Sequence, residues 1–278
     1  MVGKMSFTRR MLRNRSAALG LAVLGLVMLI AFAGPRVHGG DPFELVGRPF
    51  LPPFGKFLLG TDILGRDVAM GVIYGARTSL MIGVIATVIA VCVGTFIGGI
   101  AGYFGGRADR LLTRLTEIFQ TIPSFIFAIV IVAVLSPSIR NVIAAIAIVS
   151  WPPLARLVRG EFLAMRNREF VQACVSLGMT DARIILRHIL PNALSPIIVT
   201  GSLMVANAIL IESSLSFLGL SDPNVMSWGF MIGAGRPVLR TAWWLCAIPG
   251  VAILLTVLSI NLVGEGLNDA LNPRLRNA

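Results

Sequence analysis

The chain has 278 residues, of which 56% are hydrophobic and only 13% are charged, and its formal net charge is +11. Soluble globular domains have about a quarter of their residues charged, so this composition indicates an integral membrane protein. The basic residues lie at the ends of apolar runs, not in one patch interleaved with aromatic residues, which argues against nucleic acid as a partner. Three separated cysteines and two distant histidines predict neither a disulfide framework nor a metal site.

Six apolar stretches are each long enough to cross a hydrocarbon core about 30 Å thick, which takes ~20 helical residues. The first follows basic residues and contains an Ala-Phe-Ala triplet, which imitates a signal peptide. It is longer than the apolar region of a signal peptide, about 7–15 residues, so we interpret it as a retained helix. The sequence therefore predicts an all-α integral membrane protein with a short N-terminal tail (1–16) and six transmembrane helices within 17–278. The helices are predicted at Ala17–Gly34, Thr78–Tyr103, Leu115–Leu135, Val142–Val158, Ala193–Glu212 and Trp243–Gly264.

Lysines and arginines are divided sixteen to eight between the two sides of these predicted helices. The positive-inside rule places the richer side, with both termini and the loop 159–191, in the cytoplasm. The outer loop 35–77 is rich in Pro and Gly, so we expect mostly turns and extended chain there. The outer loop 213–242 begins with an apolar run too short to cross, and we expect it to fold back against the membrane surface.

Within the second predicted helix, Gly94, Gly98 and Gly102 recur every four residues. This spacing lets membrane helices approach closely, either inside the bundle or against a partner subunit, although small residues also occur on merely buried faces.

Acidic residues in membrane segments are candidates for ion coupling. Glu117, Glu212 and Glu265 all lie close to predicted helix ends, and Glu117 follows Arg114 by one turn, so structural pairing or solvation at the membrane interface is the preferred interpretation. Glu212 could alternatively line an outer exit. No lysine stands in a phosphate-binding P-loop, so the sequence predicts no ATPase site in this chain.

The polar segment Arg166–Pro191, RNREFVQACVSLGMTDARIILRHILP, interrupts the apolar sequence. Phe170, Cys174 and Leu177 stand at i, i+4 and i+7, which predicts one apolar helix face, and Gly178 suits the left-handed position that ends a helix. Thr180 then suits the cap of a second short helix, with a membrane helix starting near Pro191. These features are typical of a surface that docks another protein.

This segment resembles the EAA loop of ABC-importer permeases through Ala173, Gly178 and the Ile-Leu-Pro at 189–191. Gln172 and Cys174 stand where that pattern has glutamate and alanine. Six blocks occur in the order seen in C-type permeases of the dipeptide/oligopeptide/nickel branch: LGTDILGRD (Leu59–Asp67), YGARTSL (Tyr74–Leu80), AGYFGG (Ala101–Gly106), RHILPN (Arg187–Asn192), LSFLGL (Leu215–Leu220) and NLVGEGLNDALNPRL (Asn261–Leu275).

The resemblance implies a multi-pass protein of the bacterial inner membrane with no cofactor and no catalytic residue of its own. It would form half of a translocation pathway as a heterodimer with a homologous second permease. Two cytoplasmic ATPase subunits would bind ATP and Mg, and a periplasmic binding protein would deliver di- or oligopeptides. Nickel complexes, glutathione, opines or sugars are alternative cargoes, and a secondary transporter or a membrane scaffold are the alternatives of a different class.

The resemblance also assigns candidate residues. Those expected to couple to the ATPase are Phe170, Gln172, Ala173, Cys174, Leu177 and Gly178. In the first outer loop, Asp62, Arg66 and Asp67 are candidates for contact with the binding protein or the second permease. They could equally fix the loop itself, with Gly60 and Gly65 allowing tight turns and Arg66 pairing with a nearby carboxylate.

Overall fold

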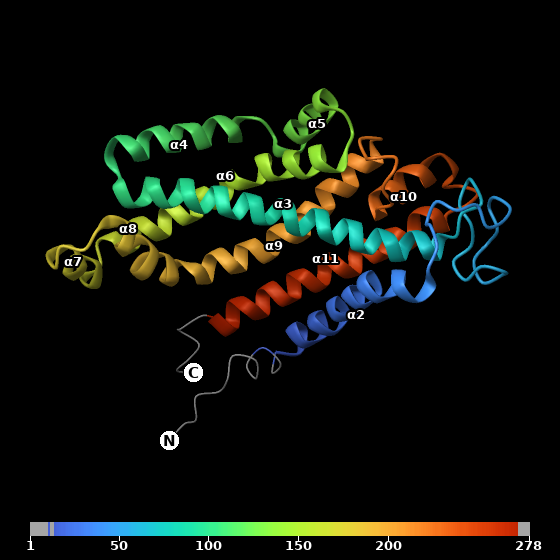
Figure 1. Cartoon of the computed structure of the whole chain (residues 1–278), viewed down its shortest axis with the longest axis horizontal. Coiled ribbons are helices and arrows are strands. Elements are labelled where there is room, and N and C mark those ends of the chain that lie inside the picture. The colour runs from blue at the N-terminus through green and yellow to red at the C-terminus, as the bar shows by residue number, and fades with distance from the viewer. Residues whose placement is uncertain (1–10, 12–13, 272–278) are drawn as a thin grey trace, which may run out of the picture.

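The computed structural model describes residue 11 and residues 14–271, and its long helices lie side by side (Figure 1). Within 14–271 there are isolated bridges but no β-strand, so the all-α prediction is confirmed. Five of these helices are long and apolar enough to cross a membrane, or six if the bent pair α4 and α5 is one span. The elements are α2 (Arg15–His38), α3 (Val68–Phe104), α4 (Gly106–Thr121), α5 (Ser124–Leu135), α6 (Ile139–Arg166), α7 (Glu169–Ser176), α8 (Asp181–Ile184), the π-helical η1 (Ile185–Ile189), α9 (Leu190–Phe217), α10 (Trp228–Gly235), the 3₁₀-helical η2 (Arg236–Val238) and α11 (Trp244–Leu271).

The continuous helix predicted at Leu115–Leu135 is wrong. The segment is divided between α4 and α5, whose axes differ by 81°. Pro123 explains the break, because it has no N–H to donate and it disfavours helical geometry in the preceding residue. Ile122 accordingly has an extended backbone, with φ −93° and ψ 131°.

Helices α3 and α6 are in close contact along the glycines of α3. A Cβ atom on Gly98 would lie 2.2 Å from the carbonyl oxygen of Ala155, and one on Gly102 would lie 2.6 Å from that of Arg159. Gly94 repeats the pattern one turn earlier. The prediction that these glycines allow close helix packing is therefore confirmed, and the partner helix belongs to the same chain.

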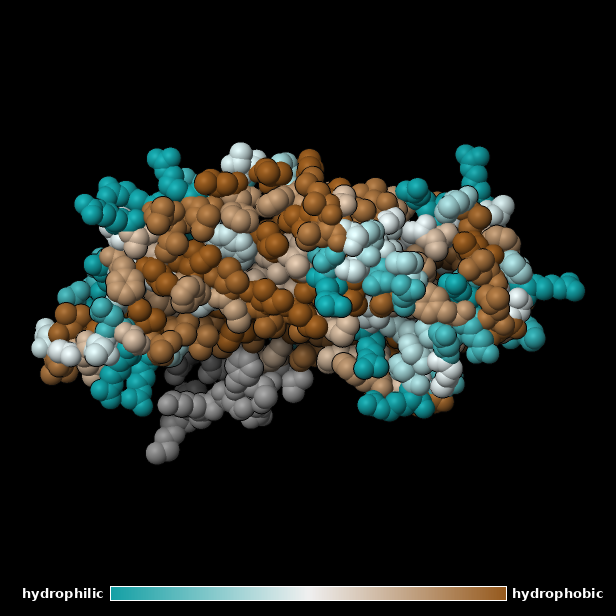
Figure 2. All heavy atoms as spheres, turned by 45° about the horizontal axis from the view of Figure 1, so that its top comes forward, coloured by the Kyte–Doolittle hydropathy of each residue, from teal (hydrophilic) through white to brown (hydrophobic). Residues whose placement is uncertain are grey.

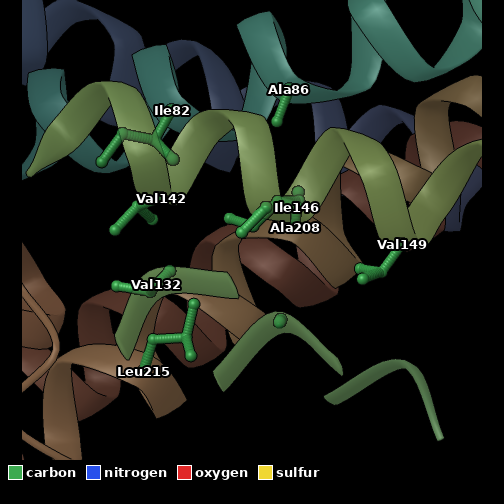
Figure 3. Packing of buried hydrophobic residues seen from close by; sticks show 10 residues of the cluster. Ile82, Ala86, Val132, Val142, Ile146, Val149, Ala208 and Leu215 are labelled. Carbon is green, nitrogen blue, oxygen red and sulfur yellow. The ribbon is translucent and has the colours of Figure 1, made fainter. Parts of the chain in front are cut away.

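Apolar side chains fill the space between α3, α5, α6 and α9. In Figure 3, Val132 of α5 and Leu215 of α9 lie beside Val142 and Ile146 of α6, and all four side chains belong to one buried cluster. The outside of the bundle also exposes many large apolar side chains, and the face seen in Figure 2 is hydrophobic over much of its length, with hydrophilic residues at its two ends and over part of its right half. This distribution is the one that a membrane-spanning bundle requires.

The two outer loops have different structures. Residues 39–67 form turns and bends, as predicted, whereas 35–38 and 68–77 of the predicted loop belong to α2 and α3. Gly65 (φ +85°) must lack a side chain because a Cβ would lie 2.2 Å from the Gly47 carbonyl oxygen. The second loop folds back as predicted, but it packs into the bundle. Its helix α10 contacts α3, α9 and α11. The buried Trp228 ring donates a 3.0 Å hydrogen bond to the Val72 carbonyl oxygen.

Replacing Gly98 with leucine should destabilise the bundle, because the obstacle to the new side chain is backbone that cannot move aside. Overpacking typically costs about 1–3 kcal/mol, and we expect the upper end of that range here. The measurement is the thermal midpoint of the purified protein in detergent. Gly25→Leu is the matched control, since a Cβ there meets nothing within 4 Å. Equal midpoints for the two variants would contradict this account of the contact between α3 and α6.

Candidate functional site

The short helix α7 lies at the end of the bundle where α3 and α6 also end (Figure 1). Val171 and Cys174 face inward, with exposed fractions of 1% and 8%, in a cluster that includes Phe162. Phe170 and Leu177 face outward, with exposed fractions of 43% and 78%. One side of α7 is therefore fixed to the membrane helices and the other presents apolar side chains to solvent.

The structure corrects the single apolar face predicted for Phe170, Cys174 and Leu177. Cys174 packs against the chain's own core, so it positions the helix and does not form part of the exposed surface. Gln172 and Ala173 are exposed beside Phe170 and Leu177. Five of the six candidate coupling residues are thus accessible at this end of the molecule.

Gly178 ends α7 in the left-handed conformation predicted for it, with φ +72°. The N–H of Met179 donates to the Cys174 carbonyl oxygen (3.1 Å), and the N–H of Gly178 donates to that of Val175 (2.9 Å). This pair of bonds is the Schellman motif, which satisfies carbonyl groups that a helix end otherwise leaves unpaired. A Cβ on Gly178 would meet nothing within 4 Å, so only backbone conformation restricts this position.

The second short helix of the segment is not separate. Helices α8, η1 and α9 follow one another without a gap over Asp181–Phe217, while α9 itself begins at Leu190, next to Pro191 as predicted. The π-helical turn η1 directly precedes α9, which has Pro191 in its first turn. A proline removes one helical hydrogen bond and crowds the carbonyl four residues earlier, and the wider turn accommodates both effects. Thr180 occupies the cap position as predicted, but its side chain forms no capping hydrogen bond.

Two polar contacts fix the surroundings of α7. The hydroxyl of Tyr103, near the end of α3, donates a 2.7 Å hydrogen bond to Asp181 at the start of α8. Arg159 of α6 binds Asp109 of α4 through two hydrogen bonds of 2.5 and 2.7 Å, the paired geometry of a strong guanidinium–carboxylate contact. Sequence reasoning found neither contact, since each joins residues at least 50 positions apart.

In the first outer loop the candidate residues have structural partners. An oxygen of Asp62 accepts hydrogen bonds from two backbone N–H groups at 2.8 and 2.9 Å, one of them that of Arg66. Asp67 caps α3 by accepting from the Ala69 N–H at 2.8 Å. Arg66 lies 4.8 Å from the ring centre of Phe43 and, in the part of the chain that the structure describes, pairs with no carboxylate. The expected ion pair of Arg66 is therefore wrong, whereas the role of this loop as a contact surface remains a prediction.

The three glutamates differ from one another. Glu212 is 2% exposed and accepts hydrogen bonds from Ser216 (2.9 Å) and Ser227 (2.7 Å), so it joins α9 to the start of α10 inside the protein. Glu117 and Glu265 are exposed. Glu117 does not pair with Arg114, since the salt bridge found across 14–271 is that of Arg159 with Asp109, and its solvation at the membrane interface remains a prediction. No group of three metal-binding side chains occurs among the residues described.

Known proteins resemble this chain in sequence and in fold. The family described as the binding-protein-dependent transport system inner membrane component matches residues 94–277, which include the whole of α7 and its flanking helices. The chain belongs to this family. It is the permease component of an ABC importer, and the match confirms the resemblance found in the sequence.

Curated relatives agree along nearly the whole chain. A di/tripeptide transport system permease protein DppC of Pseudomonas aeruginosa is 41% identical and aligns with 98% of this chain and 92% of its own length. A dipeptide transport system permease protein DppC of Bacillus subtilis is 39% identical, covering 96% of this chain and 85% of the relative. A probable D,D-dipeptide transport system permease protein DdpC of Escherichia coli is 38% identical, covering 91% and 85%.

Solved structures share the fold at lower identity. A chain of the MetNI methionine ABC transporter in an inward-facing conformation superposes with a TM-score of 0.61 at 17% identity. The superposition covers 73% of this permease and 96% of that chain. Almost all of the solved chain is therefore contained in the fold of this longer permease.

Replacing Gly178 with valine should abolish transport without preventing membrane insertion, because valine in the left-handed conformation costs about 1–2 kcal/mol or more. The end of α7 would then rotate and carry Leu177 away from its position. Alanine at the same position should have a milder effect. The measurements are the amount of permease in membranes and the rate of substrate uptake.

Gly160→Val is the matched control for Gly178→Val. A Cβ on Gly160 would also meet nothing within 4 Å, but Gly160 lies inside α6 without a positive φ. We expect uptake by the control to stay close to that of the unmodified protein. Unchanged uptake by Gly178→Val would show that the orientation of α7 does not depend on this glycine.

Proposed function

We propose that this permease forms half of the membrane pathway of an ATP-driven importer of di- and oligopeptides. A homologous second permease completes the pathway, two cytoplasmic ATPase subunits bind ATP and Mg, and a periplasmic binding protein delivers the cargo. The observation that carries the proposal is the exposed apolar side of α7, with Phe170 and Leu177, on a helix whose other side is buried in the membrane bundle. Such a surface suits contact with a protein partner, and its apolar side chains carry no group that could take part in covalent chemistry.

The mechanism is mechanical. ATP binding brings the two ATPase subunits together, and α7, seated in one of them, moves with that subunit. The buried contacts of Val171 and Cys174 and the hydrogen bond from Tyr103 to Asp181 connect α7 to α3, α6 and α9. A displacement of α7 is thereby passed to the membrane helices, which shift between inward-open and outward-open arrangements.

Peptides are the proposed cargo because the relatives that align with this chain over 85% or more of their own length are named as dipeptide or di/tripeptide permeases. Nickel complexes, glutathione, opines and sugars are the alternatives within the same machinery. The binding protein makes the first selection, so this permease needs only a pathway that tolerates a peptide.

We place the end of the bundle that carries α7 in the cytoplasm, together with both ends of the chain. Asn14 and Asp269, near the two ends of the described chain, are joined by a 3.1 Å hydrogen bond and therefore lie on one side. If α4 and α5 count as one crossing, the chain crosses the membrane six times, and an even number of crossings also places both ends on one side. The excess of lysine and arginine on that side favours the cytoplasm.

Reconstitution tests the function. The permease assembled with its second permease, ATPases and binding protein in proteoliposomes should take up a dipeptide only when ATP is present on the ATPase side. The permease alone should hydrolyse no ATP, because it has no phosphate-binding loop. Uptake driven by a proton or sodium gradient without ATP would indicate a secondary transporter. Absence of both uptake and ATPase copurification would indicate a scaffold.

Cysteine labelling in intact cells tests the orientation. A cysteine at Pro53, in the first outer loop, should react with an impermeant thiol reagent, whereas one at Thr180 should react only after the cells are opened. Both positions are exposed or half-exposed in the fold, so burial does not account for the difference. A third informative position, Ser6, lies outside the described residues. Labelling at Thr180 but not at Pro53 would reverse the orientation.

A further inference from the structure

Helix α4 carries a continuous polar stripe on its exposed surface. The stripe residues are three or four positions apart and so share one helix face, and all of them are exposed. A neighbouring face of the same helix exposes three large apolar side chains, and the exposed Ile122 follows directly after the helix end. The polar stripe consists of Arg107, Arg110, Arg114, Glu117 and Thr121, and the apolar stripe of Leu111, Leu115 and Ile118, continued by Ile122.

The stripe reaches deep into the bundle. After the turn at Gly105, α4 runs back alongside α3 (Figure 1). Near its other end, the ring of Phe119 lies 5.2 Å from that of Trp151, centre to centre, in a cluster that includes Ala90. Ala90 is in the middle of the apolar part of α3, so the end of α4 and the break at Pro123 lie at the same depth.

Charged side chains that face lipid at such a depth are strongly disfavoured, and those found in membrane segments face a water-filled cavity or a partner. Broken membrane helices likewise occur where the backbone lines a cavity or is buried in protein. Glu117 lies within two turns of the break at Pro123 and forms no salt bridge among residues 14–271. It also borders a hollow between α3, α4 and α6 that contains Thr113, Arg156 and Arg159.

We propose that the polar stripe of α4 lines the water-filled cytoplasmic half of the translocation pathway and contacts the peptide as it leaves. This inference rests on the proposed function. Three guanidinium groups and one carboxylate offer partners of both signs to a zwitterionic cargo, and their spacing along α4 lets a peptide exchange one partner for the next. The apolar stripe faces lipid or the second permease.

Paired cysteine positions at equal depth test the proposal in the assembled transporter. Cys92 and Cys246 are first replaced with alanine, while the buried Cys174 is retained and its background labelling is measured in this parent. Single cysteines are then placed at Glu117 and Thr121 on the polar stripe. Their controls are the adjacent positions Ile118 and Ile122 on the apolar stripe, in the same parent.

The reagent is a charged, impermeant methanethiosulfonate added from the ATPase side. We expect Glu117→Cys and Thr121→Cys to react about tenfold faster or more than Ile118→Cys and Ile122→Cys, because the reactive thiolate forms readily only in contact with water. Trapping the ATPases with ATP in a hydrolysis-blocked state should slow the reaction at the polar positions, since that end of the pathway then closes.

Other labelling patterns would overturn the proposal. Equal rates at polar and apolar positions would mean that α4 lies at the membrane surface, and no reaction at either would mean that the second permease covers the stripe. Labelling is measured independently of transport. Loss of ATP-dependent uptake in the parent protein would therefore count against the proposed function and leave the labelling result intact.

Discussion

The close contact between α3 and α6 sets the positions of the other elements at the α7 end of the bundle. Because Gly98 and Gly102 have no side chain, the two backbones approach to a distance that any other residue would prevent. The same approach brings Tyr103, at the end of α3, within 2.7 Å of Asp181 beyond α7. It also leaves Arg159 of α6 positioned to bind Asp109 of α4. The elements at the α7 end of the bundle are thus attached to one closely packed pair of helices.

In the proposed function, this arrangement separates two surfaces that serve one process. The exposed side of α7 is suited to receive a displacement from a protein partner, while the polar stripe of α4 is suited to face water and cargo. Both helices are fixed to α3 and α6, α7 by burial of Val171 and Cys174 and α4 by the ion pair of Asp109. A movement imposed on α7 therefore reaches the stripe through packed side chains and does not require a flexible link.

Local chemistry in the sequence predicted much of this structure. The apolar runs located the helices, the glycine spacing predicted close packing, and Gly178 was recognised as a left-handed helix end, because each of these features depends on neighbouring residues alone. The inward orientation of Cys174 and the burial of Glu212 depend on distant segments, so periodicity could not reveal them. Pro123 is a local signal for the break between α4 and α5, but the prediction of one continuous helix relied on length and hydropathy instead.

We infer that α7 moves as one body with α3 and α6. The most direct test is the distance between spin labels at Ser176 in α7 and at the exposed Phe96 in α3, measured in the assembled transporter without nucleotide and with ATP in a hydrolysis-blocked state. We predict an unchanged distance within this chain, while the distance from Ser176 to the second permease changes between the two states. A shift within the chain of about one helical pitch, ~5 Å, would contradict the account.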